Sequence, residues 1–356
     1  MAAHCYIKKL KLHNFRNHSS FELDLGDNPV VITGKNGIGK TNILEAISFL
    51  AKSNGITKAK ASEMQNRFNN EDWAVHYGFF NGTDFNPIGI AKNFNKKLIQ
   101  IDGKTQSSYS SLYRISNVIW LVPQMDYILL NSPSDRLKLL DRIVSLFEEN
   151  YIYCYMRYRK AKNERSKLLR ENILDENWLS SLENVMAVNA VNILRMRLSV
   201  LKTLQDTIDS YSTEFFPKAS LKFNSQLALN DTAEYFQSHL KKNREKDSLT
   251  GRVTFCVNND KFQVFCQKRD ISVNLCSTGE QKLLLLSVIL SSVKARCIHH
   301  NKAPLLLLDD IMSHLDKHYR KVLIEEMLNI QCQTWITDVD RNSFDNYIDY
   351  FKLIEL

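Results

Sequence analysis

The segment NPVVITGKNGIGKTNILEAI (28–47) constrains the fold of this chain more than any other. A short apolar strand leads into the loop GKNGIGKT (34–41), and a helix follows. The loop has the G-x-x-x-x-G-K-[ST] spacing, in which glycines let backbone N–H groups surround phosphates. A chance glycine loop would rarely place eight residues in register between a strand and a helix. The segment therefore predicts an α/β nucleotide-binding protein.

The residue types of this loop suit the phosphates of ATP. Lys40 is predicted to carry positive charge to the β- and γ-phosphates, and Thr41 is predicted to offer its hydroxyl to Mg²⁺. The rest of the loop is predicted to bind ATP mainly through its backbone: Gly34, Lys35, Asn36, Gly37, Ile38 and Gly39.

A second half of the same site is expected in APLLLLDDI (303–311). This segment reads as a buried strand that ends in two carboxylates. Asp309 is predicted to hold Mg²⁺ through water, and Asp310 is predicted to polarise the water that attacks ATP. Alone, such a strand could simply end in a turn, but beside a phosphate loop the catalytic interpretation is favoured.

The stretch STGEQKLLLL (277–286) indicates another phosphate site at the beginning of a helix. The loop at 34–41 already surrounds one set of phosphates, so this site is predicted to bind the nucleotide of a second copy. That is the ABC-type arrangement, in which two subunits enclose two nucleotides. A capped core helix is the alternative. The residues predicted to act in trans are Ser277, Thr278, Gly279, Glu280 and Gln281.

Two further polar residues have ABC-type spacing. Asp316, in SHLD, follows the Asp309–Asp310 carboxylate pair at the distance of a D-loop. Gln124, in WLVPQMD, lies at a predicted strand end, where a Q-loop glutamine would contact Mg²⁺ and water. A lone glutamine after proline is also common at a protein surface.

Helical patterns occupy the middle of the chain, and alternating or apolar strand patterns lie on both sides of them. Helical spacing runs from about 134 to 215, whereas 251–275 reads as strand-like. We therefore expect a discontinuous ABC-type ATPase domain at 1–130 and 250–356. A compact, mainly helical lobe is expected at 131–249.

The balance of charge suggests a polyanionic partner, since the chain has a formal net charge of +8. Without a base-reading motif, DNA binding is expected to involve the backbone and to depend on salt. A solvated helix face is the alternative for the basic segment 157–171. The residues predicted to contact DNA are Arg157, Arg159, Lys160, Lys162 and Arg165.

The location expected from the sequence is the cytoplasm. The seven cysteines form no CxxC pair, which is typical of free thiols in a reducing compartment. No apolar run approaches the length of a membrane helix, and no secretory signal is recognisable at the N-terminus. No membrane partner is expected.

Taken in order, the motifs resemble those of the RecF family, recombination-mediator ATPases related to SMC and Rad50 heads. The resemblance implies an ATP-dependent homodimer, binding to double-stranded and gapped or junction DNA, and weak DNA-dependent ATP hydrolysis. It also implies partnership with RecR and RecO in loading RecA, and a role for Arg16 in ATP binding. The segments that carry it are LHNFRNH, GKNGIGKTNILEAI, WLVPQMD, SPSDRLKLLDR, STGEQKLLLLS and LLLLDDIMSHLD.

The chain also departs from ABC-type patterns. No histidine follows the strand TWITDVD, which leaves Thr337 as the candidate γ-phosphate sensor. Asp310 is shorter than the usual glutamate, which suggests slow hydrolysis. Another SMC- or Rad50-like ATPase of DNA metabolism and a scaffold with a vestigial site remain alternatives. A transporter ATPase subunit is disfavoured by the long separation between Lys40 and Ser277.

Overall fold

The computed structural model of the chain describes residues 5–51, 55–66, 68, 71–94, 96–107, 110–210, 216–300, 302–330 and 332–356. The chain divides into two compact units, each built from separate stretches of sequence. Unit 1 comprises Met1–Asp126, Thr213–Phe216 and Leu285–Leu356. Unit 2 comprises Tyr127–Ser212 and Pro217–Leu284.

The second boundary between the units differs from the one expected from the sequence. The sequence assigned 250–284 to the ATPase domain, whereas the structure places this segment in unit 2. The reason is strand pairing, because β10 (Lys261–Cys266) runs antiparallel to β9 (Ala219–Asn224). The predicted helical lobe therefore also contains a small sheet.

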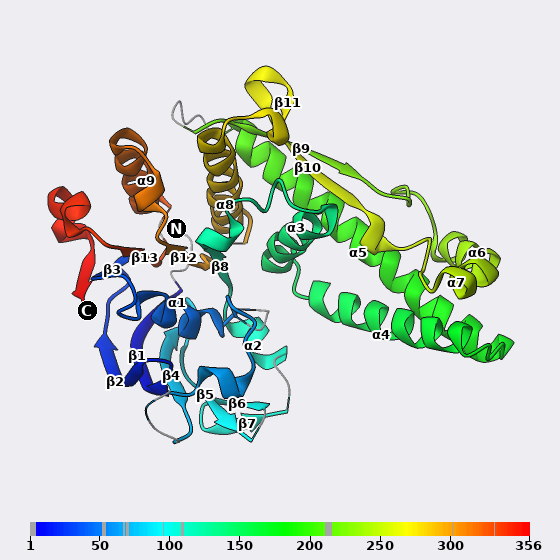
Figure 1. Cartoon of the computed structure of the whole chain (residues 1–356), viewed down its shortest axis with the longest axis horizontal. Helices are drawn as coiled ribbons and strands as arrows, with labels where there is room; N and C mark the ends of the chain where they lie inside the picture. The colour runs from blue at the N-terminus through cyan, green and yellow to red at the C-terminus, as the bar shows by residue number, and fades with distance from the viewer. Residues whose placement is uncertain are drawn as a thin grey trace. The chain divides into compact units, whose positions relative to one another are not determined.

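A parallel sheet forms the centre of unit 1 (Figure 1). Its order is β14-β3-β13-β12-β8, and each neighbouring pair is parallel. All but β14 are buried along their length, which explains their runs of apolar residues. The strands are β3 (Val30–Thr33), β8 (Val118–Leu121), β12 (Leu305–Asp309), β13 (Thr334–Asp338) and β14 (Lys352–Glu355).

An antiparallel sheet of order β2-β1-β4-β5-β6-β7 forms the other part of unit 1. Its first two strands, β1 and β2, form an antiparallel pair that turns at Arg16 and Asn17. β5 was not predicted, because Pro87 and Gly89 interrupt its pattern. The strands are β1 (Tyr6–Phe15), β2 (His18–Asp24), β4 (Ala74–Phe80), β5 (Phe85–Asn93), β6 (Lys96–Ile101) and β7 (Lys104–Gln106).

Helix α1 (Lys40–Ser48) lies between these two sheets (Figure 1). It contacts β8, β12 and β13 on one side. On the other side, the hydroxyl of Tyr77 in β4 donates to the carbonyl of Ala46 at 2.5 Å. The remaining helices of unit 1 are α2 (Ser110–Ile115), the second part of α8 (Thr278–His300), α9 (Lys317–Asn329), η1 (Ala61–Met64), η2 (Pro123–Met125), η6 (Met312–His314) and η7 (Arg341–Tyr350).

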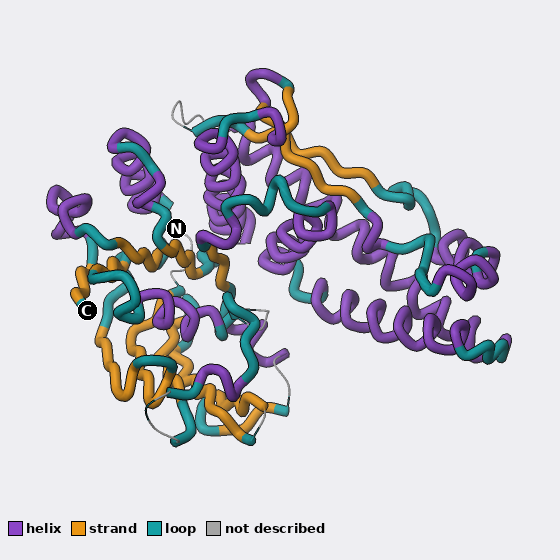
Figure 2. The backbone as a smooth tube through the Cα atoms, viewed as in Figure 1, coloured by secondary structure: helices purple, strands orange, loops and turns teal. Residues whose placement is uncertain are grey.

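Unit 2 is mainly helical, as the purple ribbons of Figure 2 show. Its long helices α4 and α5 pack against each other and confirm the predicted helical block. Beyond β9 and β10, its elements are α3 (Pro133–Phe147), α4 (Tyr151–Arg170), α5 (Glu176–Ser210), α6 (Ala233–Lys242), α7 (Arg244–Thr250), η3 (Val257–Asn259), η4 (Gln267–Arg269), β11 (Ile271–Ser272), η5 (Val273–Leu275) and the beginning of α8. The predicted strand character of 251–259 is wrong, because this segment folds into turns and η3.

Arg165 lies inside unit 2, so the prediction that it contacts DNA is wrong. Its side chain is 0% exposed. Its guanidinium donates to Glu183 at 2.9 Å, to Asp247 at 2.7 Å and to the carbonyl of Leu240 at 2.7 Å. The basic pattern of α4 concealed this inward position, because helical spacing puts Arg165 on the same face as the buried Tyr158.

Helix α8 is long and apolar enough to cross a membrane by length and composition alone, contrary to the expectation that no segment reaches that length. However, 78% of its most apolar window is buried inside the protein, as in the core helix of a folded domain. Among the described residues, it is the one helix with this composition.

Candidate functional site

The predicted phosphate loop joins β3 to α1 at the carboxyl edge of the parallel sheet. Gly34, Gly37 and Gly39 have φ values of 147°, 81° and 117°, which glycine adopts readily and residues with a side chain rarely adopt. The residues from Lys35 to Ile38 are exposed, and α1 begins with Lys40, directly after Gly39. The loop thus presents N–H groups and a helix N-terminus together, as an anion site requires.

The side chains at the beginning of α1 reach both the loop and β12. The ammonium of Lys40 donates to the carbonyl of Gly34 at 2.6 Å and to that of Lys35 at 3.2 Å. The hydroxyl of Thr41 lies 3.0 Å from each carboxylate oxygen of Asp309. The structure therefore brings together the two halves of the site, which lie far apart in the sequence.

Asp309 and Asp310 have different surroundings although they are adjacent. Burial raises the pKa of Asp309, while hydrogen bonds from Thr337 and Thr41 oppose this rise. Asp310 has a φ of 49°, in the left-handed region that aspartate occupies more often than most residues. Its Oδ1 is buried without a hydrogen-bond partner. Such an unpaired acceptor beside a phosphate loop suits a water or a metal ion.

Gln124 and Asp316 also lie in unit 1. Gln124 is exposed in η2, directly after β8, and so follows a strand at the carboxyl edge. Asp316 caps α9, because its Oδ1 accepts the backbone N–H of Tyr319 at 2.9 Å. A role in a D-loop would add to this capping role.

The residues predicted to act in trans, 277–281, form a signature segment that lies in unit 2, at the beginning of α8. Ser277, Thr278 and Gly279 are exposed. The carboxylate of Glu280 accepts the backbone N–H of Ser277 at 2.9 Å, and the Ser277 hydroxyl accepts the backbone N–H of Glu280 at 3.4 Å, which together form a capping box. Gln281 is buried, and its amide donates to the carbonyl of Cys276 at 2.8 Å, so it orders the loop from within.

Arg269 supports the signature segment from η4. Its guanidinium donates to Glu280 at 2.6 Å, on the oxygen that does not bind Ser277. This ion pair is partly exposed and fixes the Glu280 carboxylate. Arg269 could not be predicted from the sequence, because an arginine eight residues before the motif has no spacing signal.

The comparisons with known proteins agree with this architecture. A family model described as AAA ATPase domain matches residues 6–334. The DNA replication and repair protein RecF of Rickettsia prowazekii is 34% identical to this chain over 360 residues, which cover 99% of both proteins. RecF of Rickettsia akari is also 34% identical, over 99% of both. This chain belongs to the RecF family.

Solved structures support the same fold for this RecF-family chain. A structure of the recombination mediator protein RecF with ATP matches with a TM-score of 0.83 at 22% identity, covering 96% of this chain and 94% of that one. The Smc head domain of Pyrococcus furiosus matches with a TM-score of 0.57 at 16% identity, covering 96% and 92%. The expected ABC-type ATPase head, interrupted by a mainly helical lobe, is thereby confirmed.

The turn between β1 and β2 contacts the phosphate loop, which the sequence did not predict. The amide of Asn17 donates to the carbonyl of Ile38 at 2.6 Å, and the His18 ring lies 3.2 Å from the carbonyl of Gly39. Arg16, which the RecF resemblance assigned to ATP, instead pairs with Glu45 at 2.8 Å. Contact between Arg16 and ATP would require that this ion pair rearrange.

The other basic residues of α4 differ in their exposure. Arg157, Arg159 and Lys160 are exposed, and Arg157 donates to the hydroxyl of Tyr153 at 3.0 Å. Lys162 is half-buried and donates to Asn258. Fewer of the residues predicted to contact DNA are therefore exposed than the sequence suggested.

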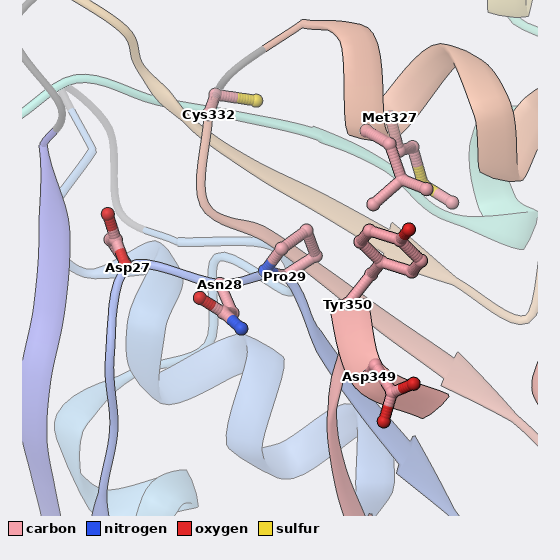
Figure 3. A pocket seen from close by; sticks show the side chains of 8 residues that line it. Asp27, Asn28, Pro29, Met327, Cys332, Asp349 and Tyr350 are labelled. Carbon is pink, nitrogen blue, oxygen red and sulfur yellow. The ribbon is translucent and has the colours of Figure 1, made fainter. Parts of the chain in front are cut away.

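A small pocket lies at the opposite edge of the parallel sheet from the phosphate loop (Figure 3). Its volume is about 230 Å³. Asp27, Asn28 and Pro29 line it just before β3, and Tyr350 and Met327 contribute from η7 and α9. Because ligands of parallel α/β sheets bind at the carboxyl ends of the strands, this pocket is not part of the nucleotide site.

Proposed function

We propose that this RecF-family chain is an ATP-dependent, DNA-binding recombination mediator. It binds ATP with Mg²⁺, forms a homodimer on ATP and DNA, and hydrolyses ATP weakly in response to DNA. It acts with RecR- and RecO-type proteins to help load RecA at gapped DNA. The observation that carries the proposal is the contact between Thr41 and Asp309 beside the unpartnered oxygen of Asp310.

The residues of unit 1 fit this activity. Lys40 would exchange its loop carbonyls for phosphate oxygens, and Thr41 and Asp309 would hold Mg²⁺, with Gln124 nearby. When bound, Mg²⁺ supplies positive charge that offsets the charge of the phosphates. Asp310, which is only partly buried, would accept a proton from the attacking water through its carboxylate.

The nucleotide part of the proposal is tested with two substitutions. Lys40→Ala should weaken binding of a fluorescent ATP analogue by about 10- to 100-fold, because the variant makes no charge-assisted hydrogen bond to the phosphates. Asp310→Asn should keep that affinity and lower hydrolysis about 100-fold, because the general base is removed. Lys321→Ala, on an exposed position of α9, is the control. Hydrolysis by Asp310→Asn at the parental rate would contradict the role of Asp310.

The DNA part rests on the exposed basic residues of α4. Replacing Arg157, Arg159 and Lys160 with alanine should weaken binding to gapped and duplex DNA alike, because phosphate contacts carry no sequence information. On duplex DNA, the slope of log affinity against log salt should flatten by about 0.9 for each phosphate that the variant no longer neutralises. The matched control changes the same charge in unit 1, at three exposed lysines: Lys96, Lys104 and Lys352. If the control flattens the slope and the α4 variant does not, the DNA surface lies on unit 1.

The cytoplasm is the compartment that this function requires. The seven cysteines are free thiols in the structure, and six of them are buried. Free buried thiols are typical of proteins in a reducing compartment.

A further inference from the structure

Thr337 occupies a different place from the one expected of a phosphate sensor. It lies on β13, in register with Asp309 on β12. Its exposed fraction is 0%. A side chain without accessible surface does not contact a nucleotide that binds at the exposed loop, so the sensor prediction does not explain this threonine.

The hydroxyl of Thr337 instead joins the two carboxylate residues that follow one another at the end of β12. It donates to Oδ1 of Asp309 at 2.7 Å and accepts the backbone N–H of Asp310 at 2.9 Å. A hydroxyl has a single proton to donate, and here that proton points to Asp309. One side chain thus fixes the carboxylate of one residue and the peptide of the next.

The bond to the Asp310 peptide is needed because that backbone is strained. A φ of 49° costs free energy for a residue with a side chain, and such conformations persist where neighbours hold them. The turn directs the Asp310 carboxylate so that its Oδ1 is buried without a hydrogen-bond partner. Without the Thr337 hydroxyl, the peptide would lose its acceptor and the carboxylate its fixed direction.

We propose that Thr337 is a positioning residue that sets the geometry of Asp309 and Asp310 together, and so couples the Mg²⁺ ligand to the general base. This inference rests on the proposed ATPase function. It assigns Thr337 no contact with nucleotide, metal or water.

The test compares substitutions that remove or keep the hydroxyl. Thr337→Val keeps the volume and the β-branched shape, and Thr337→Ser keeps the hydroxyl. Thr334→Val is the matched control, since Thr334 is equally buried on the same strand and its hydroxyl contacts Cys332. Thr337→Val should lower kcat at saturating Mg²⁺ and ATP by about 10- to 100-fold, as loss of groups that orient metal ligands does. Thr337→Ser should restore most of kcat, and Thr334→Val should keep it.

A second readout does not depend on turnover. Mn²⁺ binding in the presence of a non-hydrolysable ATP analogue, followed by electron paramagnetic resonance, should weaken about tenfold or more in Thr337→Val and not in Thr334→Val. Equal thermal stability of the two valine variants would show that misfolding is not the cause. If Thr337→Val is poorly folded, the test rests on Thr337→Ser, which keeps the hydroxyl. A loss of kcat in Thr337→Ser as large as the loss expected of Thr337→Val would overturn the role of the hydroxyl.

The outcomes separate this inference from the proposed function. If the parental protein neither binds nor hydrolyses ATP, the proposed function fails first. If the parent hydrolyses ATP and Thr337→Val keeps the parental kcat and Mn²⁺ affinity, only the positioning role is overturned.

Discussion

Replacing Arg165 with methionine should destabilise unit 2 without acting through DNA. Methionine resembles the arginine stem in volume, so the main change is the loss of the guanidinium. That group is fully buried and binds Glu183 and Asp247. Its removal takes away the positive charge that pairs with the Asp247 carboxylate, which is a costly defect inside a protein.

The magnitude follows from what the neighbours retain. Breaking a buried ion pair by removing one partner typically costs about 3–5 kcal/mol. Glu183 keeps a second partner, because Arg244 donates to both its oxygens at 2.9 and 2.7 Å. Asp247 keeps a hydrogen bond from the backbone N–H of Thr254 at 2.8 Å. The cost should therefore lie near the lower limit, at about 3 kcal/mol.

Hydrogen exchange of the full chain measures the free energy of opening of α4 and α5 directly. This measurement does not assume that the two units unfold together. Arg159→Met, at an exposed position on the same helix, should change it by less than about 0.5 kcal/mol. Arg159→Met should instead weaken DNA binding. Unchanged protection of α4 and α5 in Arg165→Met, together with a lower salt slope for DNA, would refute the buried position of Arg165.

The remaining predictions concern unit 1. Gly39→Ala should weaken ATP binding, because a φ of 117° is strained for alanine and its Cβ would displace the side-chain ends of Asn17 and His18, which lie 2.5 and 2.7 Å from the Cβ position. Calorimetry with ATP measures this loss, and parental affinity would contradict the described turn. Burial lowers the pKa of Lys97 from 10.5 to about 8. The unfolded chain therefore binds more protons between these values, so stability should rise as the pH increases from about 8 to 10.5. Lys97→Met should flatten this rise in urea unfolding, and an equal rise in the variant would contradict the assignment.

The sequence predicted the parts of the fold whose signals are local. The strand, loop and helix around Lys40 follow from glycine spacing and from apolar runs that a buried parallel strand produces. The long helices of unit 2 follow from helical periodicity. β5 was missed because Pro87 lies within it, and the pairing of β9 with β10 was missed because register between distant strands has no local signal.

The sequence predicted which residues belong to the candidate site, but it did not predict which of them contact one another. Thr41 and Asp309 belong to motifs, but only strand order brings them to 3.0 Å. Arg165 looked like its basic neighbours, because composition does not reveal which face of a helix is buried. Thr337 was selected for the absence of a histidine, whereas its contacts depend on the register of β13 with β12.

We predict that the signature segment of one chain acts on the nucleotide bound by a second copy. Ser277→Arg should leave ATP binding by the monomer nearly unchanged, because Lys40, Thr41 and Asp309, which are predicted to bind ATP and Mg²⁺ within one chain, all lie in unit 1. It should block ATP-dependent dimers, because a bulky cation would occupy the contact with the partner's phosphate. Lys40→Ala should also remain monomeric, because it lacks bound nucleotide.

The most direct measurement is sedimentation of an equal mixture of Ser277→Arg and Lys40→Ala chains with ATP, after hydrogen exchange has shown that both are folded. In a mixed dimer one site combines both defects, and the other site has neither. We expect ATP to restore some dimer in the mixture although each variant alone stays monomeric. A mixture that remains monomeric, under conditions in which the parental chain dimerises with ATP, would contradict the role of the signature segment in trans.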